Sequence, residues 1–288
     1  MYLLKLLAEL AATDSTQLEQ SAPRRAALES LGRFSAKTLA AALPLGLAAL
    51  PTQAGTTTIL DSLTLALQLE RLQEALYARA LAAPAGFFPA DATIRASIVT
   101  MQRHQQQHIT LLSDAITNSG GTVPAQPNYD FTGSRNNTQP AFFASVFSNF
   151  DDFLRLAQLL EDAGVRAYKG QVQSLISNDF ILQTALQIHA TEARHAARIR
   201  IIRQKRAAVV KPWPSPADAS ITVAGKTDIV YSGENALEQL VPGYRPVPFR
   251  LLPIGFPGTN ILTQGVPEAF DEPLSTAQAS TIMELFTY

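Results

Sequence analysis

The chain has 288 residues, of which 47% are hydrophobic, so it is long enough to bury a substantial core. Its formal net charge of −1 provides no overall field that would attract nucleic acid, and we expect no nucleic-acid partner. The lack of cysteine excludes disulfides, thiolate metal ligands and thiol nucleophiles, which leaves His, Asp and Glu as candidate reactive groups.

Residues 1–57 have the pattern of a leader or an N-terminal arm. Arg24 and Arg25 precede an apolar stretch from Thr38 to Leu50, and this order resembles a twin-arginine export signal. The alternative is an arm that stays attached and packs on the body or on a neighbouring subunit. The location therefore stays open, exported or periplasmic if the leader works and cytoplasmic otherwise. The apolar stretch contains Pro44 and is too short to span a bilayer, so no transmembrane helix is expected.

Residues 58–210 are predicted to form an all-α domain. Apolar periodicity indicates four long helices, at residues 58–82, 91–119, 141–170 and 178–207. The segments APAGFFPA and GGTVPAQPNYDFTGSRNNTQP break the pattern at 83–90 and 120–140. One long connection between two short ones is typical of an up-down four-helix bundle in which a single crossover travels the length of the bundle.

Polar side chains interrupt the apolar seam of each predicted helix. Steps of three and four residues place the following residues in the seams: Glu70, Glu74, Tyr77, Gln105, His108, Glu161, Tyr168, Glu192 and His195. His104 lies beside the seam of the second helix. A buried carboxylate costs several kcal/mol unless it is compensated, and a cation bound by carboxylates and imidazoles would compensate it. The alternative is a set of buried side chains that hydrogen-bond to one another without an ion.

Four runs carry a family resemblance: LQLERLQEALYARAL, HQQQHITLL, LAQLLEDAGVRAYKG and TEARHAARIR. They resemble the ferritin-like superfamily, and within it the ferritin-like domain proteins that include the desiccation-related proteins of plants and bacteria. The resemblance implies a four-helix bundle with a di-iron or di-manganese centre. Carried over by position, it implies as metal ligands Glu70, Gln105, His108, Glu161, Glu192 and His195, with Glu74, His104 and His189 as additional candidates. The family pattern has glutamate where this chain has Gln105, which brings no charge to the site.

Together with these residues, the resemblance implies a metal-binding stress protein of the desiccation-related type that holds one or two iron or manganese ions. Tyr77 and Tyr168 are the candidates for hydrogen bonding to a ligand carboxylate or for passing an electron in iron and peroxide chemistry. Whether the protein is an enzyme stays open, because Gln105 weakens one ion position. The alternatives are a structural or protective bundle that has lost one or both metals, and an assembly or partner-binding protein. We also expect a homo-oligomer.

Residues 211–288 form a proline-rich extension that is predicted to pack on the bundle or on a neighbour. Within it, ITVAGKTDIVYSG is predicted as a short hairpin and LSTAQASTIMELFTY as a final amphipathic helix. The basic run between Arg194 and Lys211 could contact anionic lipid heads at a membrane surface, but a solvated helix face is the favoured interpretation.

Overall fold

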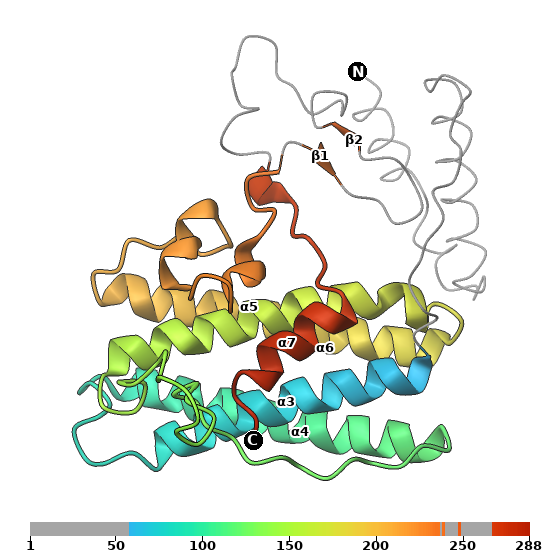
Figure 1. Cartoon of the computed structure of the whole chain (residues 1–288), viewed down its shortest axis with the longest axis horizontal. Helices are drawn as coiled ribbons and strands as arrows, with labels where there is room; N and C mark the ends of the chain where they lie inside the picture. Colours follow the sequence, from blue (N-terminus) through green and yellow to red (C-terminus); the bar gives the residue numbers. More distant parts are fainter. Residues whose placement is uncertain (1–57, 237, 240–246, 249–266) are drawn as a thin grey trace, which may run out of the picture. The chain divides into compact units, whose positions relative to one another are not determined.

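The computed structural model of the protein describes residues 58–236, 238–239, 247–248 and 267–288. Its four long helices are α3 (Ile59–Leu81), α4 (Ala92–Asn118), α5 (Phe150–Leu175) and α6 (Asp179–Lys205). Helix α3 packs against α4 and α5, and α6 packs against α5 and α4, which closes a four-helix bundle (Figure 1). The predicted all-α bundle with one long crossover is confirmed. The predicted leader and most of the proline-rich run 244–260 lie outside the described residues.

Short polar side chains begin each of the four long helices. Thr58 and Asp61 form a capping box at the start of α3, in which each side chain accepts a hydrogen bond from the other residue's backbone N–H. Asp91, Asn149 and Asn178 cap α4, α5 and α6 by accepting hydrogen bonds from backbone N–H groups of the first turn. Each cap satisfies a donor that the helix itself leaves unpaired.

Helix α5 begins later than the apolar pattern predicts. The predicted start at residue 141 is wrong, because residues 141–149 form turns and α5 starts at Phe150. The backbone N–H groups of Phe142 and Phe143 both donate to the carbonyl of Thr132 in the crossover, which removes them from a helical hydrogen-bond pattern. Their rings pack beside the main hydrophobic core. The aromatic residues that suggested a helix therefore hold the crossover in place.

The apolar core divides into two clusters. One cluster contains Leu67, Leu112 and Ile188, together with neighbouring apolar residues. The other contains Ile98 and Ile199 and many more. Gln105, Glu192 and His195 lie in the sequence between members of the two clusters and are buried together with Glu70 and Glu161, so the middle of the bundle isolates these residues from solvent.

The C-terminal extension is irregular until its last helix. It contains the 3₁₀ turns η2 (Pro216–Ile221), η3 (Asp228–Tyr231) and η6 (Pro267–Ala269), the antiparallel pair β1 (Glu238–Gln239) and β2 (Val247–Pro248), and helix α7 (Thr276–Glu284). The predicted hairpin at 221–233 is wrong, because that segment forms a turn and η3. The predicted final helix is confirmed as α7, which contacts α3 and α5 and is drawn in red in Figure 1.

The extension covers α5, and this explains why α5 is buried on nearly every side. Arg166 of α5 donates to the backbone carbonyls of Val230, Ser232 and Glu272. The backbone N–H of Leu274 donates in turn to the carbonyl of Arg166 at 2.9 Å. Close to this contact, Gly170 is required, because a side chain there would overlap the carbonyl oxygen of Leu274.

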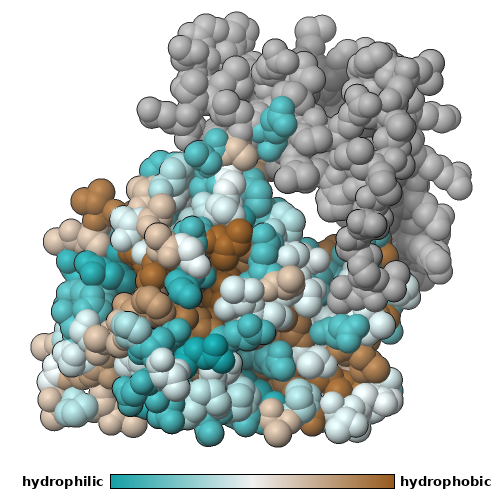
Figure 2. All heavy atoms as spheres, in the orientation of Figure 1, coloured by the Kyte–Doolittle hydropathy of each residue, from teal (hydrophilic) through white to brown (hydrophobic). Residues whose placement is uncertain are grey.

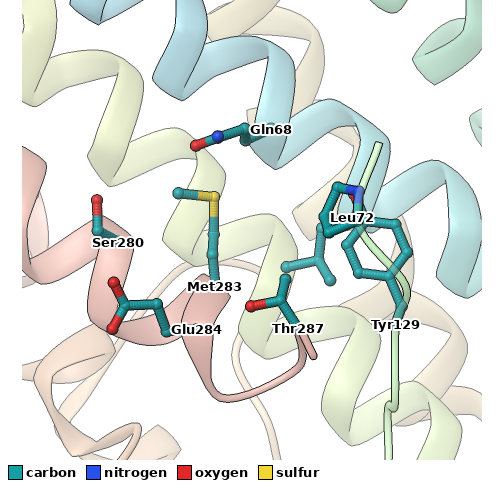
Figure 3. A pocket seen from close by; sticks show the side chains of 8 residues that line it. Gln68, Leu72, Tyr129, Ser280, Met283, Glu284 and Thr287 are labelled. Carbon is teal, nitrogen blue, oxygen red and sulfur yellow. The ribbon is translucent and has the colours of Figure 1, made fainter. Parts of the chain in front are cut away.

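The end of the chain also joins the crossover to α3. The backbone N–H of Asp130 donates to Phe286 O at 2.8 Å, and Tyr129 forms an isolated β-bridge with Thr287. A cavity of about 240 Å³ lies beside this junction and is lined by residues that include Gln68, Leu72, Tyr129 and Met283 (Figure 3). No polar residue of the bundle seams lines it.

Hydrophilic and hydrophobic residues are interspersed over the face drawn in Figure 2. Among the helices of the described residues, none is both long enough and apolar enough to cross a membrane.

Candidate metal centre

The bundle brings together side chains from all four long helices. Glu70 of α3, Glu161 of α5 and Glu192 of α6 are fully buried, each with 0% exposure. The predicted partners from α4 and α6 meet them in the same place. Two groups of three side chains result, one formed by Glu70, His108 and Glu192, the other by Glu161, Glu192 and His195.

The first group joins α3, α4 and α6. His108 Nδ1 lies 3.0 Å from Glu70 Oε2 and 3.4 Å from Glu192 Oε1. His108 Nδ1 also lies 3.1 Å from the side-chain oxygen of Gln105. Both His108 and Gln105 therefore face the carboxylates, as their spacing of three residues on a helix predicts.

The second group joins α5 and α6. His195 Nδ1 lies 3.5 Å from Glu161 Oε2 and 3.6 Å from Glu192 Oε1. In each group one atom per residue lies within 4.8 Å of the others, a separation that a single ion can span. Glu192 belongs to both groups, so the two ion positions would share this carboxylate.

Two buried atoms of the centre have no hydrogen-bond partner. They are Glu192 Oε1 and His195 Nδ1, and both face the space between the carboxylates. A buried polar atom without a partner costs about 1–3 kcal/mol. Because both atoms are ordinary ligands of iron, manganese and zinc, an ion at this point would satisfy them, and the residues present fit such a group.

The two tyrosines orient the outer carboxylates. Tyr77 donates its hydroxyl hydrogen to Glu161 Oε1, and Tyr168 donates to Glu70 Oε1 at 2.7 Å. Each contact leaves the second oxygen of the carboxylate facing a histidine. Burial and the adjacent carboxylates raise the pKa of both phenols well above its ordinary value, so both hydroxyls keep their proton.

Gln73 is a residue of the centre that the sequence analysis missed. Its side-chain nitrogen donates to Glu192 Oε2 at 3.1 Å, and the side-chain nitrogen of Gln105 donates to the same oxygen at the same distance. Glu192 Oε2 is thus capped by two amides while Oε1 faces the two histidines. The available signal was its spacing, since Gln73 follows Glu70 by three residues on the same helix face.

Burial and the charges of neighbouring groups give the carboxylates of the centre different pKa values. Burial and the charge of Glu192 raise the pKa of Glu70 to about 7 and that of Glu161 to about 8. Burial acts to raise the pKa of Glu192 as well, but the nearby imidazoles of His108 and His195 outweigh burial and lower that pKa below its ordinary value.

The histidines respond to the same carboxylates. Burial disfavours the charged imidazolium, but the nearby carboxylates of Glu192 and Glu70 outweigh it and raise the pKa of His108 to about 9. The carboxylates of Glu161 and Glu192 likewise outweigh burial and raise the pKa of His195 to about 10. Without a bound ion, protons on the histidines therefore offset the carboxylate charge, and a metal that binds has to displace them.

Three further candidates lie outside both groups. The Glu74 carboxylate accepts hydrogen bonds from Gln102 and Gln106, each at 3.0 Å, on the outer side of α3 and α4. His189 Nδ1 lies 3.0 Å from the carbonyl of Val165. His104 is close to the centre but contacts it only through His195.

Comparison with known families agrees with this arrangement. A family model described as a ferritin-like domain matches residues 58–205. The matched span runs from the N-cap of α3 to the last residue of α6, and so contains the four helices of the bundle and every residue of the candidate centre. A comparison with curated proteins gives no match.

Proposed function

Since this chain belongs to the ferritin-like domain family, we propose that it is a metal-binding stress protein whose bundle core holds one or two iron or manganese ions. One observation carries the proposal. Two groups of three ligand side chains share Glu192. The unpaired atoms Glu192 Oε1 and His195 Nδ1 face the position that an ion would occupy.

We assign the residues as follows. Glu70 and His108 would hold one position, Glu161 and His195 the other, and Glu192 would contribute to both. Gln105 is neutral, whereas the family pattern has a glutamate at this position of the second helix. The protein ligands therefore bring three negative charges against two divalent ions. We therefore propose unequal positions, of which one binds more weakly.

An ion of this kind would supply one-electron redox chemistry with oxygen or peroxide. Tyr77 and Tyr168 would hold Glu161 and Glu70 in the geometry that the ion requires. The apolar clusters on either side would exclude bulk water from the site, which strengthens each electrostatic contact inside it. The role that we propose is protection against iron and peroxide during desiccation or a similar stress. Turnover as an enzyme would require both ion positions to be occupied.

A bundle kept for structure is the second candidate, and one observation favours it. The protonated histidines already offset two of the three glutamates, since His108 lies 3.0 Å from Glu70 and His195 lies 3.5 Å from Glu161. The core can therefore fold around ion pairs alone. In that case any metal binds weakly and the protein has no redox role.

Metal stoichiometry separates the two candidates. We expect the full chain, dialysed against Fe²⁺ under argon or against Mn²⁺, to retain one to two ions per chain by elemental analysis. The double variant Glu192→Ala, His195→Ala should retain none. Glu74→Ala is the matched control, because this glutamate lies on α3 but outside both groups, and it should bind as the wild type does. A wild type that retains no ion would leave only the structural candidate.

A further inference from the structure

A groove between α4 and α6 leads from the surface to the candidate centre. It has a volume of about 420 Å³ and is lined by residues that include Ser97, Thr100, Met101, His104, His195 and Arg198. His195 is only 4% exposed, so it forms part of the groove floor while its other edge faces the buried carboxylates. The groove is therefore a place where a molecule from solvent can approach a residue of the centre.

His104 contacts His195 in a specific geometry. Nδ1 of His104 lies 3.0 Å from Nε2 of His195, and the two ring planes differ by 9°. The ring centroids are 5.2 Å apart, although the two nitrogens are only 3.0 Å apart. In rings stacked face to face, the centroids would lie much closer together. The rings therefore lie edge to edge in nearly one plane, the arrangement of a well-aligned hydrogen bond.

This hydrogen bond determines which edge of His195 faces the centre. A histidine on a helix can turn its ring about the last side-chain bond, and a turn of half a circle would replace Nδ1 by a carbon. With Nε2 held by His104, Nδ1 of His195 stays directed at Glu161 and Glu192. His108 does not need such a partner, because its own Nδ1 is fixed by Glu70 and Gln105.

We propose that His104 is a positioning residue that fixes the orientation of His195 for metal binding. The inference rests on the proposed function, since it concerns the ion position formed by Glu161, Glu192 and His195. The outer partner of a metal-bound histidine is usually a carboxylate, a carbonyl or water, and its loss weakens metal affinity about 10–100-fold. Here the partner is the imidazole of His104, which lines a surface groove. A small molecule from solvent could therefore take the place of this imidazole when His104 is removed.

The test uses equilibrium dialysis of the full chain against Mn²⁺, an ion that binds free imidazole poorly. We expect His104→Ala to weaken the position that contains His195 about 10–100-fold and to leave the position that contains His108 within about twofold. His104→Gln keeps a hydrogen-bond acceptor and should retain most of the affinity. His189→Ala, which removes a part-buried histidine of α6 outside the centre, should bind as the wild type does.

Chemical rescue distinguishes positioning from packing. Because the groove opens at His104, added imidazole can enter the space left in His104→Ala and accept the hydrogen bond from His195. We expect imidazole to restore the affinity of His104→Ala and to have no effect on the wild type or on His189→Ala. Weakening that neither imidazole nor the glutamine variant corrects would overturn the proposal, and so would an affinity of His104→Ala equal to that of the wild type. A wild type that binds no Mn²⁺, Fe²⁺ or other divalent ion would refute the metal function itself.

Discussion

Restoring the fourth carboxylate should have opposite effects on the metal-free and the metal-bound protein. The perturbation is Gln105→Glu, which gives the chain the glutamate that the ferritin-like pattern has at this position. The side chain is fully buried and changes by only one atom. Its surroundings are nevertheless arranged for an amide, so the change in charge and in hydrogen-bond donors should dominate over packing.

The magnitude follows from the contacts of the amide nitrogen. It donates to Gln73 Oε1 and to Glu192 Oε2, both at 3.1 Å. In the variant both contacts become oxygen against oxygen, and the centre gains a carboxylate beside Glu192. A buried charge left without its partner costs about 3–5 kcal/mol. Taking the lower figure, the metal-free variant should unfold about 6–12 °C below the wild type.

Thermal unfolding with and without metal measures the effect. In the presence of a chelator, Gln105→Glu should be the less stable protein. With saturating Mn²⁺ the difference should shrink or change sign, because an added ligand charge tightens binding and binding stabilises the folded state. Retained metal should also rise toward two ions per chain. Gln107→Glu, an exposed change on the same helix, is the control and should lie within about 0.5 kcal/mol of the wild type under both conditions.

Two results would refute this reasoning. An equal loss of stability with chelator and with Mn²⁺ would mean that residue 105 does not face a bound ion. A metal-free variant as stable as the wild type would mean that the amide does not make the two hydrogen bonds to Gln73 and Glu192.

Three further predictions concern the protein without metal. Tyr77→Phe removes the hydrogen bond to buried Glu161 and should lower the free energy of unfolding by about 1.5–3 kcal/mol in urea titrations, and a change below 0.5 kcal/mol would contradict that contact. The raised pKa values of His108 and His195 mean that the folded state binds more protons than the unfolded state above pH 6.5. Their stabilisation is complete below that pH and should be lost as the pH rises through about 9 and about 10, which urea titrations across this window would detect as a steady decline. Arg200→Met removes a buried guanidinium that pairs with two aspartates and should cost about 3–5 kcal/mol, whereas a neutral result would show that the aspartates find other partners.

The positions of the seam residues could be predicted because helical periodicity is a local property. Glu70, Glu161 and Glu192 follow apolar steps of three and four residues, and all three are buried in the bundle. The ferritin-like domain match supports the same four helices. The four helices and the polar residues in their core could therefore be predicted from the spacing of apolar residues.

The capping of Glu192 by Gln73 could not be predicted in the same way. Glutamine is usually found at the surface, and only the assembled bundle places Glu192 within reach of the Gln73 amide. The burial of Asp162 and Arg166 was hidden for a related reason. Arg166 donates to Val230, and Asp162 accepts from Tyr231 as well as from Arg200 of α6. Val230 and Tyr231 lie in the irregular C-terminal extension, whose path has no periodicity to follow.

The start of α5 and the absence of a hairpin at 221–233 have a common cause. In both places apolar residues serve contacts distant in the chain instead of a local repeat. Phe142 and Phe143 bind the crossover through Thr132 O, and Val230 accepts a hydrogen bond from Arg166. Tertiary contacts of this kind override local propensity, and a single sequence does not reveal them.

The coverage of α5 by the end of the chain ties completion of the fold to the order of synthesis. Arg166 can donate to the carbonyl of Glu272, and the carbonyl of Arg166 can accept from the N–H of Leu274, only after the ribosome has made residues 272–274. Until then a nascent bundle leaves part of α5 uncovered, and the Arg166 guanidinium lacks one of its three backbone acceptors. A stop codon shortly before residue 272 should therefore yield a chain that aggregates or is degraded, although all four bundle helices have been translated.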